Sequence, residues 1–320
     1  MKLHPVANLL VQRIALGLLL LLAVSVLIFA GTQLLPGDVA QAILGQSATP
    51  QALANLREQL GLNDPAHVRY FRWLGGVLQG DLGKALSNGQ DIASAMGGRL
   101  WNTMFLAFWA AVISVPLAII LGLIAVRYQG RWPDKVISAV TLSTISLPEF
   151  VVGYIAMFLL AVKYRVFTSV SMVYDGMSFG DRIHAIALPV LVLVLVVLAH
   201  MMRMTRAAIL NVMQSAYVET AELKGLRPFT IIARHAFPNA IAPIVNVVML
   251  NLAYLVVGVV VVEVVFVYPG MGQFLVDHVA KRDIPVVQAC GLVFAGVYIG
   301  LNMLADVISI LSNPRLRHPK

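Results

Sequence analysis

Tyr217-Val-Glu-Thr-Ala-Glu-Leu-Lys-Gly225, running on to His235-Ala-Phe-Pro238, is a polar and basic segment between two long apolar runs. The chain around it has 320 residues, of which 59% are hydrophobic and only 12% are charged. Because soluble domains carry about 25% charged residues, this composition indicates an integral membrane protein. The polar segment is then an ordered loop outside the bilayer, and such order favours contact with a partner.

The formal net charge of +8 is spread over the loops of a membrane protein, so it does not indicate a nucleic-acid partner. The single cysteine, Cys290, lies in an apolar run, which excludes an internal disulfide framework and a cysteine-built metal site. No metal site is expected. The first apolar run is too long for the core of a signal peptide, so no cleavable signal is expected either.

Six apolar runs are each long enough to cross a bilayer, which needs roughly 20 helical residues. Their pattern is helical or fully apolar, without the two-residue alternation of a membrane barrel. The expected fold is therefore all-α, a polytopic membrane protein with six transmembrane helices. The predicted spans are residues 14–35, 100–126, 136–162, 183–202, 240–267 and 286–311.

The distribution of Lys and Arg predicts the orientation of these spans. Of the 23 basic residues, 13 fall on the side that holds both termini and the second and fourth loops. The positive-inside rule therefore places both termini in the cytoplasm. The chain divides into an N-terminus with the first span (1–35), an external helical cap (36–99), and a core of five spans (100–320) with the polar loop at 203–239.

Start and stop signals define short helices in both soluble parts. In the cap, Thr49-Pro50 starts a helix that Gly61 ends, and Asn63-Asp64-Pro65 starts a second one that ends before Gly80. In the polar loop, the stretch from Arg203 to Lys224 has no Gly or Pro, so the fourth span is expected to continue as a helix out of the membrane.

Gly225 ends that expected helix and Pro228 starts another, while Pro238 and Pro243 bracket the return to the fifth span. The loop is thus predicted to be a helix-turn-helix across the cytoplasmic face. A plain solvated loop is the alternative. The small residues Ala221 and Gly225 would let a partner approach closely.

Acidic residues inside the predicted spans cost about 2.5–3.5 kcal/mol each at mid-bilayer, so they are expected to face protein or water. Glu149 follows Pro148 in the third span. It either lines a path and favours a cationic group on the ligand, or is a packed, hydrogen-bonded acid. Glu263 and Asp306 are expected to be structural or interfacial.

The order and spacing of many short motifs resemble those of binding-protein-dependent ABC importer permeases, specifically the B-type subunit of the dipeptide/oligopeptide/nickel family. The loop motif is Glu219-x-Ala221-x3-Gly225-x9-His235-x-Phe237-Pro238, which looks like the EAA loop of these permeases. Thr220, Phe237, Ala85 and Gln90 depart from the family pattern. The other matching motifs are Leu35-Pro-Gly-Asp38, Leu60-Gly-Leu62, Gly80-Asp-Leu-Gly83, Arg203-Met-Thr-Arg206, Glu263, Tyr268-Pro-Gly-Met-Gly272, Arg282-Asp-Ile-Pro-Val-Val-Gln288, Asn302, Asp306 and Asn313-Pro-Arg315.

The resemblance implies a type I importer half-channel in a bacterial inner membrane. A paralogous permease would complete the pathway, two cytoplasmic ATPase subunits would bind ATP and Mg, and an extracytoplasmic substrate-binding protein would deliver the ligand. The chain itself has no phosphate-binding G-x-x-x-x-G-K-[ST] loop, so no cofactor and no catalytic residue are expected in it. The candidate residues are Glu219, Ala221, Lys224, Gly225 and Arg234 for ATPase coupling, Pro148, Glu149 and Phe150 for the substrate path, and Glu263, Asn302 and Asp306 for structure or interface.

Two other classes of protein remain open at this point. An ion-coupled secondary transporter would fit six spans with buried acids, but it often carries an inverted repeat, which is not evident. An intramembrane enzyme would need a base beside a nucleophile, and His200 has no serine partner in a motif. The ligand itself is not determined, because the resembling family is associated with peptides, nickel complexes, sugars and opines.

Overall fold

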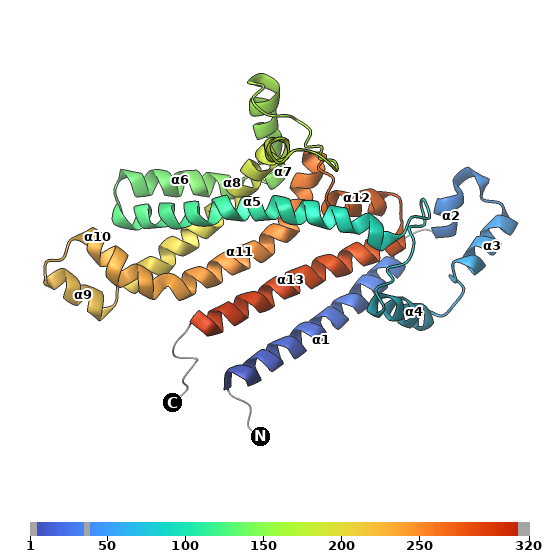
Figure 1. Cartoon of the computed structure of the whole chain (residues 1–320), viewed down its shortest axis with the longest axis horizontal. Coiled ribbons are helices and arrows are strands. Elements are labelled where there is room, and N and C mark those ends of the chain that lie inside the picture. Colours follow the sequence, from blue (N-terminus) through green and yellow to red (C-terminus); the bar gives the residue numbers. More distant parts are fainter. Residues whose placement is uncertain (1–4, 35–38, 313–320) are drawn as a thin grey trace.

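The computed structural model describes residues 5–34 and 39–312, and its regular elements there are all helices (Figure 1). Five of them are apolar and long enough to cross a membrane, and a sixth crossing is possible if one bent helix pair forms a single span. This agrees with the predicted all-α fold. The five are α1 (Pro5–Gln33), α5 (Ile92–Arg127), α8 (Phe179–Met213), α11 (Phe237–Val265) and α13 (Ile284–Ser312). Two of the motifs, at 35–38 and 313–315, lie outside the described residues.

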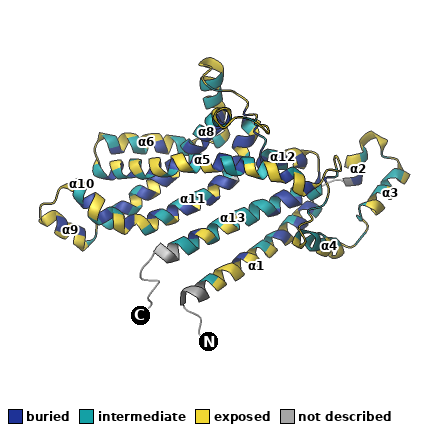
Figure 2. Cartoon of the chain, viewed as in Figure 1, coloured by how far each residue is buried: buried dark blue, intermediate teal, exposed yellow. Residues whose placement is uncertain are grey.

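α8 is the central helix of the bundle. It packs against α5 and α11, and α11 in turn packs against α13, which packs against α1. In the most apolar stretch of α8 72% of the residues are buried, against 17% in α1. Figure 2 accordingly shows exposed residues along α1 and mostly buried ones along α8. The outermost helix thus leaves most of its apolar surface for lipid or another subunit.

The third predicted span, residues 136–162, is not one straight helix. It consists of α6 (Trp132–Ser146) and α7 (Glu149–Ala156), which continues as a π-helical turn to Lys163, and the two parts are bent by 105°. Leu147, between them, has extended backbone with φ −97° and ψ 136°. A residue before proline disfavours helical backbone, and Pro148 itself has no N–H to donate. The break therefore follows from the Leu147-Pro148 pair.

The segment before α5 holds short helices at one end of the molecule: α2 (Val39–Leu44), α3 (Pro50–Gln59) and α4 (Ala66–Leu78). The Thr49 hydroxyl oxygen accepts from the amide of Ala52 at 3.2 Å, so the predicted start of α3 is confirmed. Asp91 caps α5 in the same way through the amide of Ser94, at 2.8 Å. α5 therefore begins eight residues before the expected span. The sequence did not predict α12 (Met271–Ala280), which lies between α11 and α13.

At the opposite end of the bundle, α9 (Ala216–Leu223) and α10 (Pro228–Thr230) form the polar loop (Figure 1). The fourth span does not continue to Lys224 as predicted, because α8 ends at Met213. Ser215 is extended, and its hydroxyl donates to the carbonyl of Val212 at 2.6 Å, satisfying a group that the helix end leaves free.

The second helix of the loop is not separate from the fifth span. α10 begins at Pro228, as predicted, and runs through a π-helical segment, η3 (Ile231–Ala236), directly into α11. Pro238 lies in the first turn of α11, at its start as predicted, and Pro243 lies inside the helix. A π-helical turn beside proline is a common way to accommodate the missing N–H.

Candidate functional site

The polar loop turns sharply after α9. The amide of Gly225 donates to the carbonyl of Glu222 at 2.8 Å, and the amide of Leu226 donates to the carbonyl of Ala221 at 3.3 Å. These two hydrogen bonds form a Schellman motif at the end of α9. Gly225 has φ +74°, in the left-handed region that glycine adopts without steric cost. The helix stop predicted at Gly225 is confirmed.

The inner face of this loop is a small apolar cluster. Val218 and Ala221 of α9 pack with Ile231 of η3, and all three are buried. The sequence suggested that the small side chain of Ala221 lets a partner approach. With an exposed fraction of 5%, Ala221 instead lets α9 lie close to η3, so its contact is within the loop.

The outer face of the loop is open and mixes charged with apolar side chains. The exposed residues that the sequence predicted here are Glu219, Lys224, Gly225 and Arg234. Two further side chains flank the turn: Leu223 is 83% exposed and Phe229 is 71% exposed. Sequence reasoning missed both, although their signal was present as large apolar residues in a polar loop. Clusters of this kind mark contact surfaces.

A buried ion pair joins the start of α6 to Arg206 of α8, seven residues before α8 ends at Met213. Nε and Nη2 of Arg206 each lie 2.9 Å from a different carboxylate oxygen of Asp134, which also accepts from the amide of Gly130 at 3.0 Å. The Asp134 side chain is 7% exposed. The sequence analysis named Arg206 but not Asp134, whose place in the first turn of a helix was the available signal. The pair fixes α6 relative to the base of the loop.

Glu149 lies at the break between α6 and α7, as the first residue of α7 with Pro148 as its N-cap. The Tyr254 hydroxyl of α11 donates to its Oε1 at 3.1 Å. A Cβ at Gly258 would lie 3.7 Å from the same oxygen, so the carboxylate lies against a side-chain-free patch of α11. Phe150 next to it is 50% exposed. The three predicted path residues therefore lie together at the break in the third span.

Glu263 is the centre of a buried network that ties three helices together. Its Oε1 accepts from the Thr103 hydroxyl of α5 at 2.6 Å, and its Oε2 accepts from the amides of Gly272 and Gln273 at 2.6 and 3.2 Å. The Thr103 oxygen in turn accepts from the amide of Met271 at 2.9 Å. Glu263 is fully buried, and it satisfies amides at the start of α12 that have no partner within the helix.

This network explains the glycines of the Tyr268-Pro-Gly-Met-Gly272 motif. A Cβ on Gly270 would lie 2.1 Å from Oε1 of Glu263, and one on Gly272 would lie 2.5 Å from the Cα of Val260. Neither glycine has positive φ. Both are therefore needed for space rather than for backbone conformation.

The last two predicted structural residues lie on α13. Oδ2 of Asp306 is 3.0 Å from Nη1 of Arg13, which joins α13 to α1, but the side chains are 36% and 50% exposed. Such an exposed pair contributes about 0–1 kcal/mol. The Asn302 amide donates to the Tyr298 carbonyl of its own helix at 2.8 Å. Among the described residues, no group of His, Cys, Asp and Glu could hold a metal ion.

Most of the chain matches two parts of one protein family. Residues 114–318 match the family described as "Binding-protein-dependent transport system inner membrane component", and residues 6–107 match its N-terminal membrane component. The chain is 33% identical over 295 residues to a "Probable peptide ABC transporter permease protein" of Sinorhizobium fredii, covering 92% of this chain and 94% of that one. It is 34% identical over 298 residues to the glutathione transport system permease protein GsiC of Salmonella typhi, covering 93% and 95%.

These matches cover the loop, the broken span and the Glu263 network alike. They identify the bundle as the type I ABC permease fold. Proteins of this family are multi-pass proteins of the inner membrane that work in a complex with ATPase subunits and a binding protein. The ion-coupled alternative gains no support from them. The chain belongs to the family of binding-protein-dependent transport system inner membrane components, and it is the non-catalytic permease subunit of an ABC importer.

Proposed function

We propose that this permease forms one half of the translocation pathway for peptides or similar small solutes, and that a paralogous permease forms the other half. A substrate-binding protein on the outside delivers the ligand, and two ATPase subunits bind ATP and Mg on the inside. One of the two relatives is named as a peptide transporter permease and the other as a glutathione permease, and both names support this class of substrate. The division into a cap at 36–99 and a core at 100–320 is part of the proposal.

One observation supports the proposed binding site for the ATPase. The inner face of the loop packs against η3, and its outer face is exposed. Leu223 and Phe229 leave large apolar side chains in water on either side of Gly225. Burying one such side chain contributes about 1.5–3 kcal/mol. We therefore assign this outer face, with Glu219, Lys224 and Arg234, to contact with an ATPase subunit.

Replacing Phe229 with alanine is expected to weaken the retention of ATPase subunits by about tenfold or more, since roughly 1.5–3 kcal/mol of apolar burial is lost. The measurement is the amount of ATPase that copurifies with the full-length chain in mild detergent. Phe71→Ala is the matched control, because Phe71 is 67% exposed on α4 at the opposite end. Equal ATPase retention in the two variants contradicts the assignment.

We further propose that both termini are cytoplasmic. The start of α1 and the end of α13 point toward the side of the bundle that carries α9, away from α2–α4 (Figure 1). In a Cys290→Ser background, a cysteine at position 55 of α3 is expected to react with an impermeant maleimide from outside, and a cysteine at position 222 of α9 only from the cytoplasm. The reverse pattern would rule out this topology.

For the substrate path, we propose that Glu149 attracts a positive group on the ligand. Glu149→Gln keeps the shape and can still accept the Tyr254 hydrogen bond, so only the charge is lost. Uptake of a cationic ligand is expected to fall several-fold, by about 1 kcal/mol, while uptake of a matched neutral ligand stays unchanged.

Tyr254→Phe is the control for this prediction, because it removes the hydrogen bond to Glu149 and keeps the charge. Uptake is normalised to the amount of assembled complex. If Glu149→Gln lowers the uptake of both ligands equally, then Glu149 is a packing residue and does not contact substrate.

A further inference from the structure

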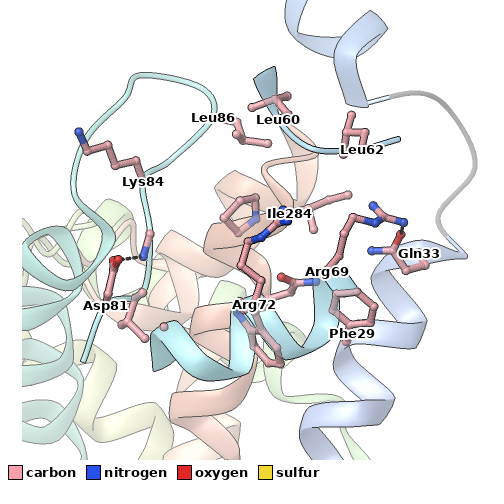
Figure 3. A pocket seen from close by; sticks show the side chains of 16 residues that line it. Phe29, Gln33, Leu60, Leu62, Arg69, Arg72, Asp81, Lys84, Leu86 and Ile284 are labelled. Atoms are coloured by element: carbon pink, nitrogen blue, oxygen red, sulfur yellow. Dashed lines mark hydrogen bonds between the residues drawn. The ribbon is translucent and has the colours of Figure 1, made fainter. Parts of the chain in front are cut away.

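A pocket of about 390 Å³ lies at the end of the bundle opposite the polar loop (Figure 3). Its walls are the end of α1, the start of α13, α4, the segment around Leu60–Leu62, and residues 81–86. Asp81 in the last segment accepts from the amide of Gly83 at 2.8 Å. Its volume is within the range of about 300–1,000 Å³ typical of small-molecule sites. None of the candidate residues for coupling or for the substrate path lines it, so it needs a separate explanation.

Two donor atoms of α4 beside the pocket have no acceptor. Nε of Arg69 and Nε1 of Trp73, both on α4, are buried without a hydrogen-bond partner. Nη2 of Arg69 donates to the side-chain carbonyl of Gln33, which is neutral. Among the described residues, no carboxylate lies within ion-pair distance of Arg69. The Arg69 guanidinium therefore lines the pocket with a neutral partner alone, which favours an anionic ligand there.

A second guanidinium lies close by. Figure 3 shows Arg69 and Arg72 rising from α4 below Leu60 and Leu62, whereas the ammonium of Lys84 points away from them. Arg72 pairs with Asp64 at 2.9 Å, but the two side chains are 62% and 41% exposed. An exposed pair of this kind is weak. Arg72 can therefore exchange Asp64 for a ligand oxygen.

The position of the pocket along the spans narrows the range of ligands that could reach it. α1 ends at Gln33 and α13 begins at Ile284, and both residues line the pocket. Apolar spans stop at the membrane–water boundary, where lipid phosphates lie and where tryptophan is enriched. Apolar walls from Phe29, Leu62 and Ile284 stand beside the two guanidinium groups. The two guanidinium groups can therefore donate to phosphate oxygens, and the apolar walls can contact a hydrocarbon group attached to that phosphate.

We propose that this pocket binds an organic phosphate ester, with Arg69 and Arg72 holding the phosphate oxygens. The chemistry is common to the headgroup of an anionic phospholipid and to a soluble phosphate ester. In the orientation proposed above, the lipid would come from the outer leaflet.

The test uses the full-length chain with its copurified partners in detergent, and native mass spectrometry counts the molecules bound. The probes are dioleoyl phosphatidylglycerol, soluble glycerol 1-phosphate, and dioleoylglycerol, which has the same chains without phosphate. Arg69→Gln is expected to weaken binding of the phosphate probe about tenfold, as expected when a hydrogen bond to a charged group is lost. Lys281→Gln, which removes an exposed charge outside the pocket, is the control and is expected to change nothing.

Binding of phosphatidylglycerol but not of glycerol 1-phosphate, sensitive to Arg69→Gln, supports the site with lipid as the source. The opposite preference, equally sensitive, supports it with a soluble ester. Equal binding by wild type and Arg69→Gln, or equal binding of dioleoylglycerol, overturns the proposal.

If Arg69→Gln fails to assemble, Arg72→Gln decides the question. It leaves the hydrogen bond between Arg69 and Gln33 in place, and it removes only the exposed pair of Arg72 with Asp64. Phosphate-probe binding reduced at least about threefold by this variant supports the site, and unchanged binding overturns it.

Discussion

Replacing Gly225 with aspartate is expected to abolish substrate-stimulated ATP hydrolysis in the reconstituted importer. The residue has φ +74°, and a side chain in this backbone region costs about 1–2 kcal/mol. No described atom of the chain lies within 4 Å of a Cβ built there, so aspartate has room in the permease itself. The side chain instead points into open space beside the loop, where we propose that the ATPase subunit lies.

Gly225→Asn is the matched control for this variant, because asparagine has the size of aspartate, tolerates the left-handed region and has no charge. It is expected to retain part of the stimulated hydrolysis, and Glu219→Ala is expected to be milder than either. The measurement is ATP hydrolysis with and without loaded binding protein, at equal amounts of assembled complex. Normal assembly and normal stimulation with Gly225→Asp would remove the coupling role from the loop.

Replacing Glu263 with alanine is expected to destabilise the permease by about 3 kcal/mol or more. The change leaves the Thr103 hydroxyl and the amides of Gly272 and Gln273 without their acceptor in a buried place, and each such group costs about 1–3 kcal/mol. The start of α12 then loses its hydrogen bonds to α11, and only the Met271 amide still donates to Thr103 of α5. The expected result is a strong loss of monodisperse protein after extraction and a lower apparent melting temperature.

Glu263→Gln separates the loss of hydrogen bonds from the loss of charge. Its amide oxygen can accept from Gly272 and Gln273, and its NH₂ group can donate to Thr103, so the variant is expected to remain close to wild type in yield. Fluorescence-detected size-exclusion chromatography after a temperature series measures both variants. If Glu263→Ala elutes and melts like wild type, then the network does not stabilise the fold.

The sequence predicted the class of protein and most of its helices, because those signals are local. Run length gives the spans, and the caps at Thr49, Gly225 and Pro228 depend on atoms within a single turn. The order of the motifs also identified the permease family, which the matches over residues 6–107 and 114–318 confirmed. The roles assigned to the coupling and path residues remain predictions.

The tertiary structure decided what depends on residues far apart in the chain. Arg206 meets Asp134 across 72 positions, and Glu263 meets Thr103 across 160; no local pattern encodes either pair. The same holds for exposure, since only packing against η3 buries Ala221 and leaves Phe229 in water. The third span was predicted as one helix; Pro148 accounts for its break, and the 105° bend depends on how α7 packs against α8 and α11. Local chemistry thus determines where helices start and stop, and long-range packing determines which side chains meet and which remain free for a partner.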